Sequence, residues 1–226
     1  MGKFLVRQSN IRQSNDSKPV LTRKKSGSNS NKSGKKKTKK LFKALFPEEA
    51  VRLIKSIQNP RDKHGLFFCL NTGLRVGELT GLVWNDVWDF FRNCPVEVLR
   101  VRGEIAKRGK ERFIPLNSKS IGALIELMKF YGKVSPEDAL LISRKKGKGL
   151  TPRQVERVIK DAAREAGITR ISVTPHVLRH SFATNVLKSG GDVMTLKELM
   201  GHSNISTTMI YLHVDGEQKR KAVEGI

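Results

Sequence analysis

The most informative stretch of the chain is TPHVLRHSFAT, residues 174–184. Thr174 and Pro175 predict the start of a helix, because a threonine hydroxyl can cap free N–H groups and proline fits the first helical turn. His176 and Arg179 are three residues apart, so a helix places them on one face. A guanidinium group beside an imidazole can hold a phosphate, and the imidazole can transfer a proton near neutral pH. The alternative is a basic helix face that meets only solvent.

A second arginine could serve the same anion. Arg75 follows a bend at Gly73 and begins a short predicted helix over 76–82. Glu78 lies one turn later and could fix the plane of the Arg75 guanidinium. At the start of a helix, backbone N–H groups also face anions. An exposed ion pair of small energetic consequence is the alternative.

Two lysines lie in a predicted turn between β-rich runs at 96–102 and 112–116. Glycines and basic residues between the two runs indicate an antiparallel hairpin or a short sheet. Lys107 or Lys110 could reach from this turn into a groove. The alternative is an ordinary basic hairpin tip.

The chain has two tyrosines. Tyr211 lies in a predicted helix over 206–214, nine residues after His202. A phenol has a pKa near 10, so it is a poor nucleophile unless a base or a strong positive potential assists it. The alternative for Tyr211 is a packed core aromatic. Tyr131 lies in an amphipathic predicted helix, and we expect it to pack.

Four segments together resemble the tyrosine recombinase (phage integrase) family. They are TGLRVGEL at 72–79, KRGKERFIPL at 107–116, PHVLRHSFAT at 175–184, and LMGHS at 199–203 followed by TTMIYLH at 207–213. Each segment is weak evidence alone, but the four occur in family order between residues 41 and 214. Together they are highly specific.

The resemblance implies a route for DNA strand cleavage. Tyr211 would attack a DNA phosphorus, which leaves a 3′-phosphotyrosyl link and a free 5′-hydroxyl. Arg75 and Arg179 would bind the non-bridging oxygens, and His202 would add a hydrogen bond. Because these fixed cations replace a metal ion, neither a metal nor another cofactor is expected.

The proton transfers follow from the same resemblance. Lys107 would protonate the departing 5′ oxygen as the general acid, with Lys110 as the alternative. His176 would accept or share the proton of the nucleophile. His180 and His213 also match the family pattern, and we expect both to be structural.

The fold expected from these patterns is a mostly helical α+β domain with one small antiparallel sheet, the tyrosine recombinase catalytic domain, over residues 41–226. Residues 1–40 carry thirteen basic residues and one acid, Asp16, without an apolar period, so they predict a disordered tail. The tail could hold DNA phosphates without reading bases, or act only as a solubilising or targeting segment. Its densest basic residues are Lys35, Lys36, Lys37, Lys39 and Lys40.

Charge and composition indicate which classes of protein this chain can belong to. The formal net charge is +23, which suits a polyanionic partner. An apolar run long enough to cross a membrane or to act as a secretory signal is missing, so membrane and secreted proteins are not expected. Cys69 and Cys94 have no metal or disulfide spacing, which suits a reducing cytoplasm.

The resemblance implies double-stranded DNA as substrate and a homotetramer on two DNA sites, located at the nucleoid. Many family members also carry an N-terminal core-binding domain, whereas only the basic tail precedes the catalytic region here. We therefore expect the short form, with limited base readout and an accessory DNA-binding protein as a further partner. The alternatives are a type IB topoisomerase-like strand relaxer and a catalytically limited DNA-binding accessory protein or regulator.

Overall fold

The computed structural model describes residues 44–143 and 148–201. The predicted basic tail and the predicted helix at 206–214 lie outside these residues. The described helices are α1 (Pro47–Ser56), α2 (Pro60–Thr72), α3 (Val76–Gly81), α4 (Trp84–Val87), α5 (Ser118–Tyr131), α6 (Pro152–Glu165), α7 (Pro175–Lys188) and α8 (Val193–Met200), with a short 3-10 turn η1 at Lys107–Gly109. The strands are β1 (Trp88–Asp89), β2 (Cys94–Pro95), β3 (Val98–Val101) and β4 (Arg112–Pro115).

The helix starts follow from local chemistry. The hydroxyl of Thr174 accepts a hydrogen bond from the N–H of Val177 at 3.3 Å, and Pro175 occupies the first turn of α7, as predicted. Thr151 caps α6 in the same way, and the side chain of Asp192 caps α8. These caps satisfy N–H groups that a helix leaves free at its start. They set the first residue of each of these three helices.

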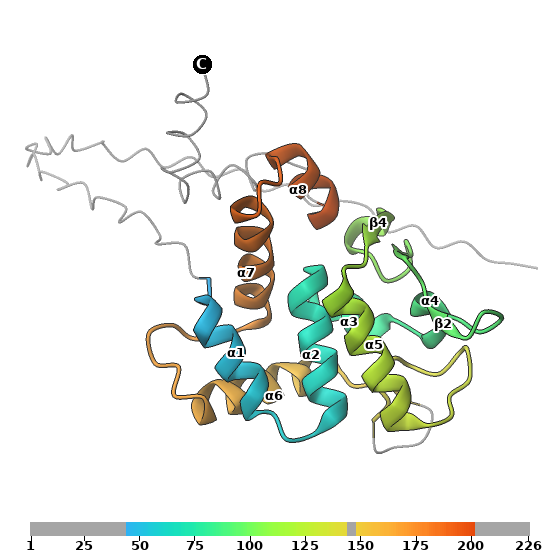
Figure 1. The fold of residues 1–226 in the computed structure, drawn as a ribbon, viewed down its shortest axis with the longest axis horizontal. Coiled ribbons are helices and arrows are strands. Elements are labelled where there is room, and N and C mark those ends of the chain that lie inside the picture. Colours follow the sequence, from blue (N-terminus) through green and yellow to red (C-terminus); the bar gives the residue numbers. More distant parts are fainter. Residues whose placement is uncertain (1–43, 144–147, 202–226) are drawn as a thin grey trace, which may run out of the picture. The chain divides into compact units, whose positions relative to one another are not determined.

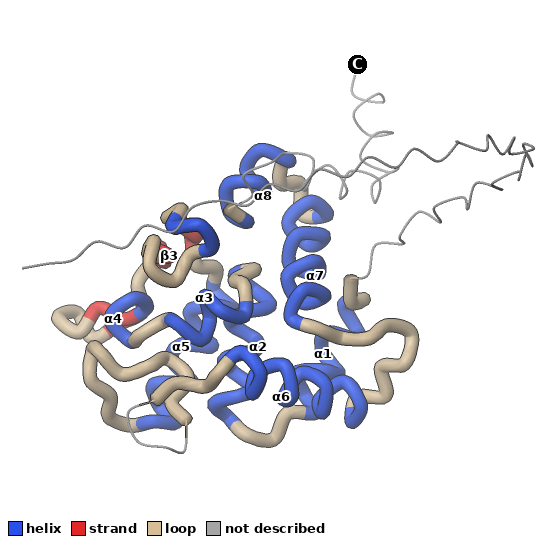
Figure 2. The backbone as a smooth tube through the Cα atoms, turned by 180° about the vertical axis from the view of Figure 1, so that it is seen from behind, coloured by secondary structure: helices blue, strands red, loops and turns tan. Residues whose placement is uncertain are grey.

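The helices pack around one main core. α2 and α5 run side by side, α6 packs against α1, and α7 stands beside α2 (Figures 1 and 2). Phe68 of α2 and Trp84 of α4 are fully buried in this core. Among the described residues, no helix is both long enough and apolar enough to cross a membrane.

The predicted antiparallel sheet is present as β3 and β4, with Leu99 opposite Ile114 and Val101 opposite Arg112. Side chains alternate across a strand, so these four residues share the buried face. A second, separate two-stranded sheet pairs β1 with β2 and was not predicted. The alternation turns Arg112 away from solvent and toward α8.

α8 belongs to a smaller apolar cluster. Its Leu196 and Met200 pack with Phe182, Ala183 and Leu187 of α7, apart from the main core. α8 also contacts β4, and Figure 1 shows it folded over the end of α7. The end of α8 therefore lies where α7 and the sheet meet.

Candidate active site

Arg75 is held by Glu78 at the start of α3. The backbone N–H of Arg75 donates to Glu78 Oε2 at 2.8 Å, and its Nη1 donates to Oε1 at 2.8 Å. The Glu78 side chain is only 1% exposed, whereas that of Arg75 is 23% exposed. The pair is therefore not the exposed ion pair considered above, and the guanidinium of Arg75 keeps access to a ligand.

Glu78 has a second arginine partner, Arg112 of β4. The Arg112 guanidinium donates two parallel hydrogen bonds to the carboxylate, Nη1 to Oε1 at 2.9 Å and Nη2 to Oε2 at 2.7 Å. Burial raises the pKa of Glu78, but the hydrogen bonds and charge of Arg112, together with the donors of Arg75, lower that pKa to about 2. Glu78 is thus ionised at neutral pH and joins the two arginines.

Arg179 of α7 is buried, with 5% of its surface exposed. Its Nη1 donates to the carbonyl oxygen of Gly73 at 2.5 Å, and its Nη2 donates to that of Met200. Because Arg179 is buried, it does not belong to a basic helix face that meets only solvent. Both carbonyls belong to helix ends, so the guanidinium joins the end of α2 to the end of α8.

Three arginines meet at the C-terminal end of α8. Three successive carbonyl oxygens each accept a hydrogen bond from a different arginine. That of Leu199 accepts from Arg112 Nε at 2.9 Å, that of Met200 from Arg179 Nη2, and that of Gly201 from Arg75 Nη2 at 3.3 Å. The last carbonyls of a helix lack intrahelical partners and carry partial negative charge, so they suit guanidinium donors. Arg75 and Arg179, which are 104 positions apart in sequence, are thereby brought to one place.

Two glycines allow this convergence. Gly73 ends α2 with φ +63°, and a Cβ there would lie 2.2 Å from Phe182 Cδ1 of α7. Gly201 ends α8 with φ +58°, and its Cβ would lie 3.0 Å from Arg112 Cδ. A side chain at either position would strain the backbone and push apart elements that the arginines connect.

The histidines of α7 differ in their surroundings. His176 is exposed, although it is on the same helix as buried Arg179. Burial lowers the pKa of His180, and the nearby charges of His176 and Arg179 lower it further. A neutral, half-buried His180 fits the structural role expected for it, while His176 stays open to a ligand.

The two candidate lysines are exposed. Lys107 begins η1, and Lys110 follows it before β4. The turn needs left-handed backbone at Arg108, φ 66°, and Gly109, φ 66°. The exposed turn leaves either lysine able to reach a ligand, so the choice between them stays a prediction. His202 and Tyr211 lie outside the described residues.

Tyr131 is packed as expected. Its ring meets Trp84 edge to face at 6.0 Å between centroids, and its hydroxyl accepts from the N–H of Ile142 at 2.9 Å. Burial raises the pKa of Tyr131 to about 12. A half-buried phenol that ionises so weakly is a poor nucleophile. Tyr211 is the other tyrosine of the chain.

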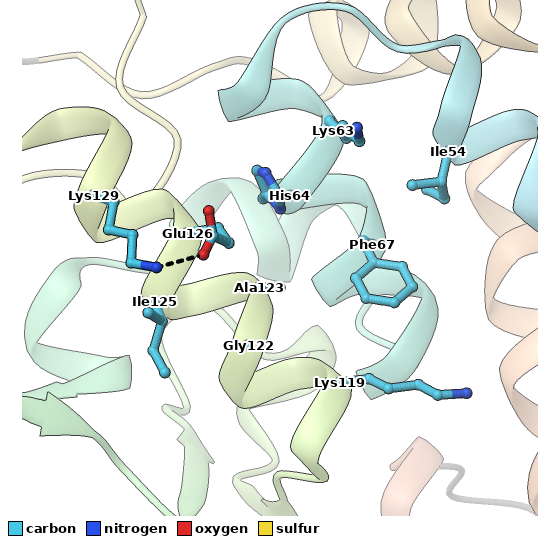
Figure 3. Close-up of a pocket in the computed structure, with 10 residues that line it drawn as sticks. All are labelled: Ile54, Lys63, His64, Phe67, Lys119, Gly122, Ala123, Ile125, Glu126 and Lys129. Atoms are coloured by element: carbon cyan, nitrogen blue, oxygen red, sulfur yellow. Dashed lines mark hydrogen bonds and ion pairs between the residues drawn. The ribbon is translucent and has the colours of Figure 1, made fainter.

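A groove of about 550 Å³ lies elsewhere, between α2 and α5 (Figure 3). Phe67 and Ile125 give it apolar walls, and Lys63 and Lys119 lie at its edge. It contains none of the predicted catalytic residues that the structure describes. Within the described residues, no cluster of three or more histidine, cysteine or acidic side chains could hold a metal ion.

Comparison with known proteins agrees with the four motifs. The model of the phage integrase family matches residues 43–218. The chain belongs to this family. Tyrosine recombinase XerA of Pyrococcus furiosus is 38% identical over 188 residues, which is 82% of this chain and 62% of the relative. The chain therefore spans less than two thirds of that relative.

Solved structures support the same fold. The crystal structure of XerA recombinase matches with a TM-score of 0.66 and 32% identity over 80% of this chain and 64% of that one. XerH site-specific recombinase, bound to its difH substrate before cleavage, matches with a TM-score of 0.63 and 24% identity over 80% of this chain and 53% of that one. The predicted fold class, a mostly helical catalytic domain with a small antiparallel sheet, is confirmed.

Sequence reasoning missed Arg112 as a member of this arginine cluster. In the sequence, Arg112 stands in the hairpin motif with no role of its own. A signal was present, because Arg112 is two positions from Ile114 in β4 and so shares its buried face, and a buried arginine needs a partner. The identity of that partner, Glu78, is visible only in the folded chain.

Proposed function

We propose that this protein is a site-specific DNA recombinase that cleaves and rejoins strands through a 3′-phosphotyrosyl intermediate. The observation that supports the proposal most is the meeting of Arg75 and Arg179 at the end of α8, the helix that leads to His202. A phosphate in the cleavage step gains negative charge on its non-bridging oxygens, and preorganised guanidinium groups stabilise that charge without reorganising.

The remaining roles follow the family motifs. Tyr211 attacks the phosphorus and His202 donates to a non-bridging oxygen. Lys107, or Lys110 in its place, protonates the leaving 5′ oxygen. His176 accepts or shares the proton of the tyrosine. The covalent link conserves the phosphodiester energy, so a second 5′-hydroxyl can reverse the step.

A basic face on α6 supports duplex DNA as the substrate. Four exposed side chains recur at intervals of three and four residues, which places them on one side of the helix. Positive charge in a line can follow a phosphate backbone, and such contacts position a protein without reading bases. The four residues are Arg153, Arg157, Lys160 and Arg164.

The assembly belongs to the same proposal. Recombination joins strands of two duplexes, so we propose a homotetramer on two DNA sites at the nucleoid, with an accessory DNA-binding protein adding base recognition. The basic tail at 1–40 would add phosphate contacts, and residues 41–226 would form the catalytic domain. Sedimentation of the protein on one-site and two-site DNA would test the assembly.

A nicked suicide duplex tests the chemistry. Cleavage next to the nick releases a short strand, so the covalent protein–DNA adduct cannot reverse and accumulates. We expect an adduct with the native protein and with Tyr131→Phe, and none with Tyr211→Phe. DNA binding without any adduct would overturn the recombinase proposal in favour of a DNA-binding regulator. If the protein forms the adduct and relaxes supercoiled DNA but never joins two sites, the result would favour the topoisomerase-like alternative.

A further inference from the structure

We propose that Arg112 is a positioning residue for strand cleavage, which holds the end of α8 against the Glu78–Arg75 pair. The inference rests on the proposed function, because the reaction it serves is the attack on DNA. Arg112 itself would touch neither the phosphate nor the leaving group. It would act through Arg75 on one side and through the residues that follow α8 on the other.

Each of the three guanidinium nitrogens of Arg112 donates a hydrogen bond. Nη1 and Nη2 bind the two oxygens of Glu78, and Nε binds the carbonyl of Leu199. The same carboxylate orients Arg75, whose Nη2 reaches the carbonyl of Gly201. One closed network therefore connects β4, the start of α3 and the end of α8.

This network offsets the limited apolar anchoring of α8. The buried residues Leu196 and Met200 pack with α7 in a cluster separate from the main core, and the half-buried Leu199 of α8 packs against both clusters. Apolar contacts are not directional, so by themselves they would let the end of α8 shift relative to Arg75. Arg112 fixes that distance, since a single planar group binds both sides. His202 follows Gly201 directly in the sequence.

Lysine could not replace Arg112 in this geometry. A planar guanidinium binds a carboxylate with two parallel bonds and still has Nε free for a carbonyl, whereas an ammonium is a point donor on a flexible stem. The Arg112 side chain also lies close to Gly201, because a Cβ added there would be 3.0 Å from Arg112 Cδ. Arg112→Lys therefore keeps the charge and loses the fixed geometry.

The structure supplies a matched control on the neighbouring strand. Arg100 also binds a carboxylate, because its Nε and Nη2 donate to Glu111 at 2.9–3.2 Å. Its side chain is 60% exposed, whereas that of Arg112 is 6% exposed. Arg100→Lys thus makes the same chemical change in an ion pair at the surface. Leu99→Ala, in the buried face of β3, is a second control that lowers stability by removing core packing.

The experiment measures single-turnover adduct formation on the nicked duplex, DNA affinity, and hydrogen exchange of the α8 amides. For Arg112→Lys we expect about 100-fold slower adduct formation, because small misplacements of reacting groups cost about that much. DNA affinity should change less than about threefold, since the charge is retained. The amides of 193–201 should exchange faster, while those of α2 should not.

The controls separate positioning from stability. Arg100→Lys and Leu99→Ala should cleave within about threefold of the native rate when saturated with DNA and assayed well below their unfolding temperatures. If Leu99→Ala is as slow as Arg112→Lys, loss of stability explains the defect and the inference fails. Native-like cleavage by Arg112→Lys would also overturn it.

The two proposals fail differently. A native protein that binds DNA and forms no adduct overturns the recombinase function. A native protein that reacts, with Arg112→Lys reacting equally fast, overturns only the positioning role. If Arg112→Lys does not fold, Arg112→Gln in the same assays takes its place, because it retains an amide donor toward Glu78. Unchanged exchange at 193–201 in the folded variant would overturn the role whatever the native protein does.

Discussion

Replacing Glu78 with glutamine should lower the free energy of unfolding by several kcal/mol. The change keeps the shape of the side chain and removes a charge that two arginines share. Glu78 accepts two hydrogen bonds from Arg112 and two from Arg75. Glutamine would also turn an N–H donor toward these donors. The buried Arg112 would then lack an anionic partner, and an unpaired buried charge is costly.

Two routes give a similar magnitude. Lowering the pKa of Glu78 from 4.5 to about 2 corresponds to about 3 kcal/mol, at about 1.4 kcal/mol per pKa unit. Removal of one partner from a buried ion pair costs roughly 3–5 kcal/mol in other proteins. We therefore expect Glu78→Gln to lower the free energy of unfolding by about 3 kcal/mol at pH 7.

The pH dependence gives the sharper test. A pKa that is lower in the folded state stabilises the protein above the unfolded pKa, and this stabilisation disappears as pH falls toward the folded pKa. The difference between native protein and Glu78→Gln should thus shrink from about 3 kcal/mol at pH 7 to about 1.4 kcal/mol at pH 3. Chemical denaturation from pH 7 to pH 3 measures it, with Glu111→Gln as the exposed control, expected to change little. A difference that stays constant from pH 5 to pH 3 would refute an ionised, arginine-paired Glu78.

Three further predictions concern the leaving group, the tail and the packing of α2. Lys107→Ala should slow adduct formation about 10²–10⁴-fold, and a substrate with sulfur at the 5′ bridging position should restore the rate, because a thiolate leaves without a proton; rescue of Lys110→Ala instead would assign the general acid to Lys110. Replacing the lysines of 35–40 with glutamine should weaken binding to all DNA sequences alike and flatten its salt dependence in titrations from about 50 to 200 mM salt, whereas a loss confined to one sequence would contradict this role. Gly73→Ala should lower the free energy of unfolding by about 2–4 kcal/mol, because a Cβ would lie 2.2 Å from Phe182 Cδ1 on left-handed backbone; a loss below about 1 kcal/mol in denaturant unfolding would show that α2 and α7 can move apart.

Local signals predicted much of the fold. The threonine–proline starts of α6 and α7 and the glycine ends of α2 and α8 depend on residues within one helical turn, so sequence alone locates them. The amphipathic helix predicted to contain Tyr131 begins at Ser118, because the side chain of Asn117 accepts from the N–H of Ser120 and caps it. The β1–β2 pair was missed because strands of two residues give no period to detect.

The candidate site was only partly open to sequence reasoning. The pairing of Arg75 with Glu78 follows from helical spacing, and the structure shows it. The spacing of His176 and Arg179 predicts a shared helix face but not their different burial. One turn of a helix can face solvent at one residue and a packed neighbour at the next, so His176 is exposed and Arg179 is buried. Sequence reasoning missed the role of Arg112 because its partner, Glu78, is 34 positions away in the chain.

What the sequence determined by itself is the order of the motifs, the helix caps and the alternation that turns Arg112 inward, since each depends on neighbours in the chain. Tertiary structure alone decided which carbonyl oxygens meet the three guanidinium groups. Those contacts join residues near 75, 112, 179 and 200, and they exist only at the distances at which α2, α7, α8 and β4 pack. A local period carries no information on such distances, so the convergence at the end of α8 becomes visible only when the side chains fill the space between the elements.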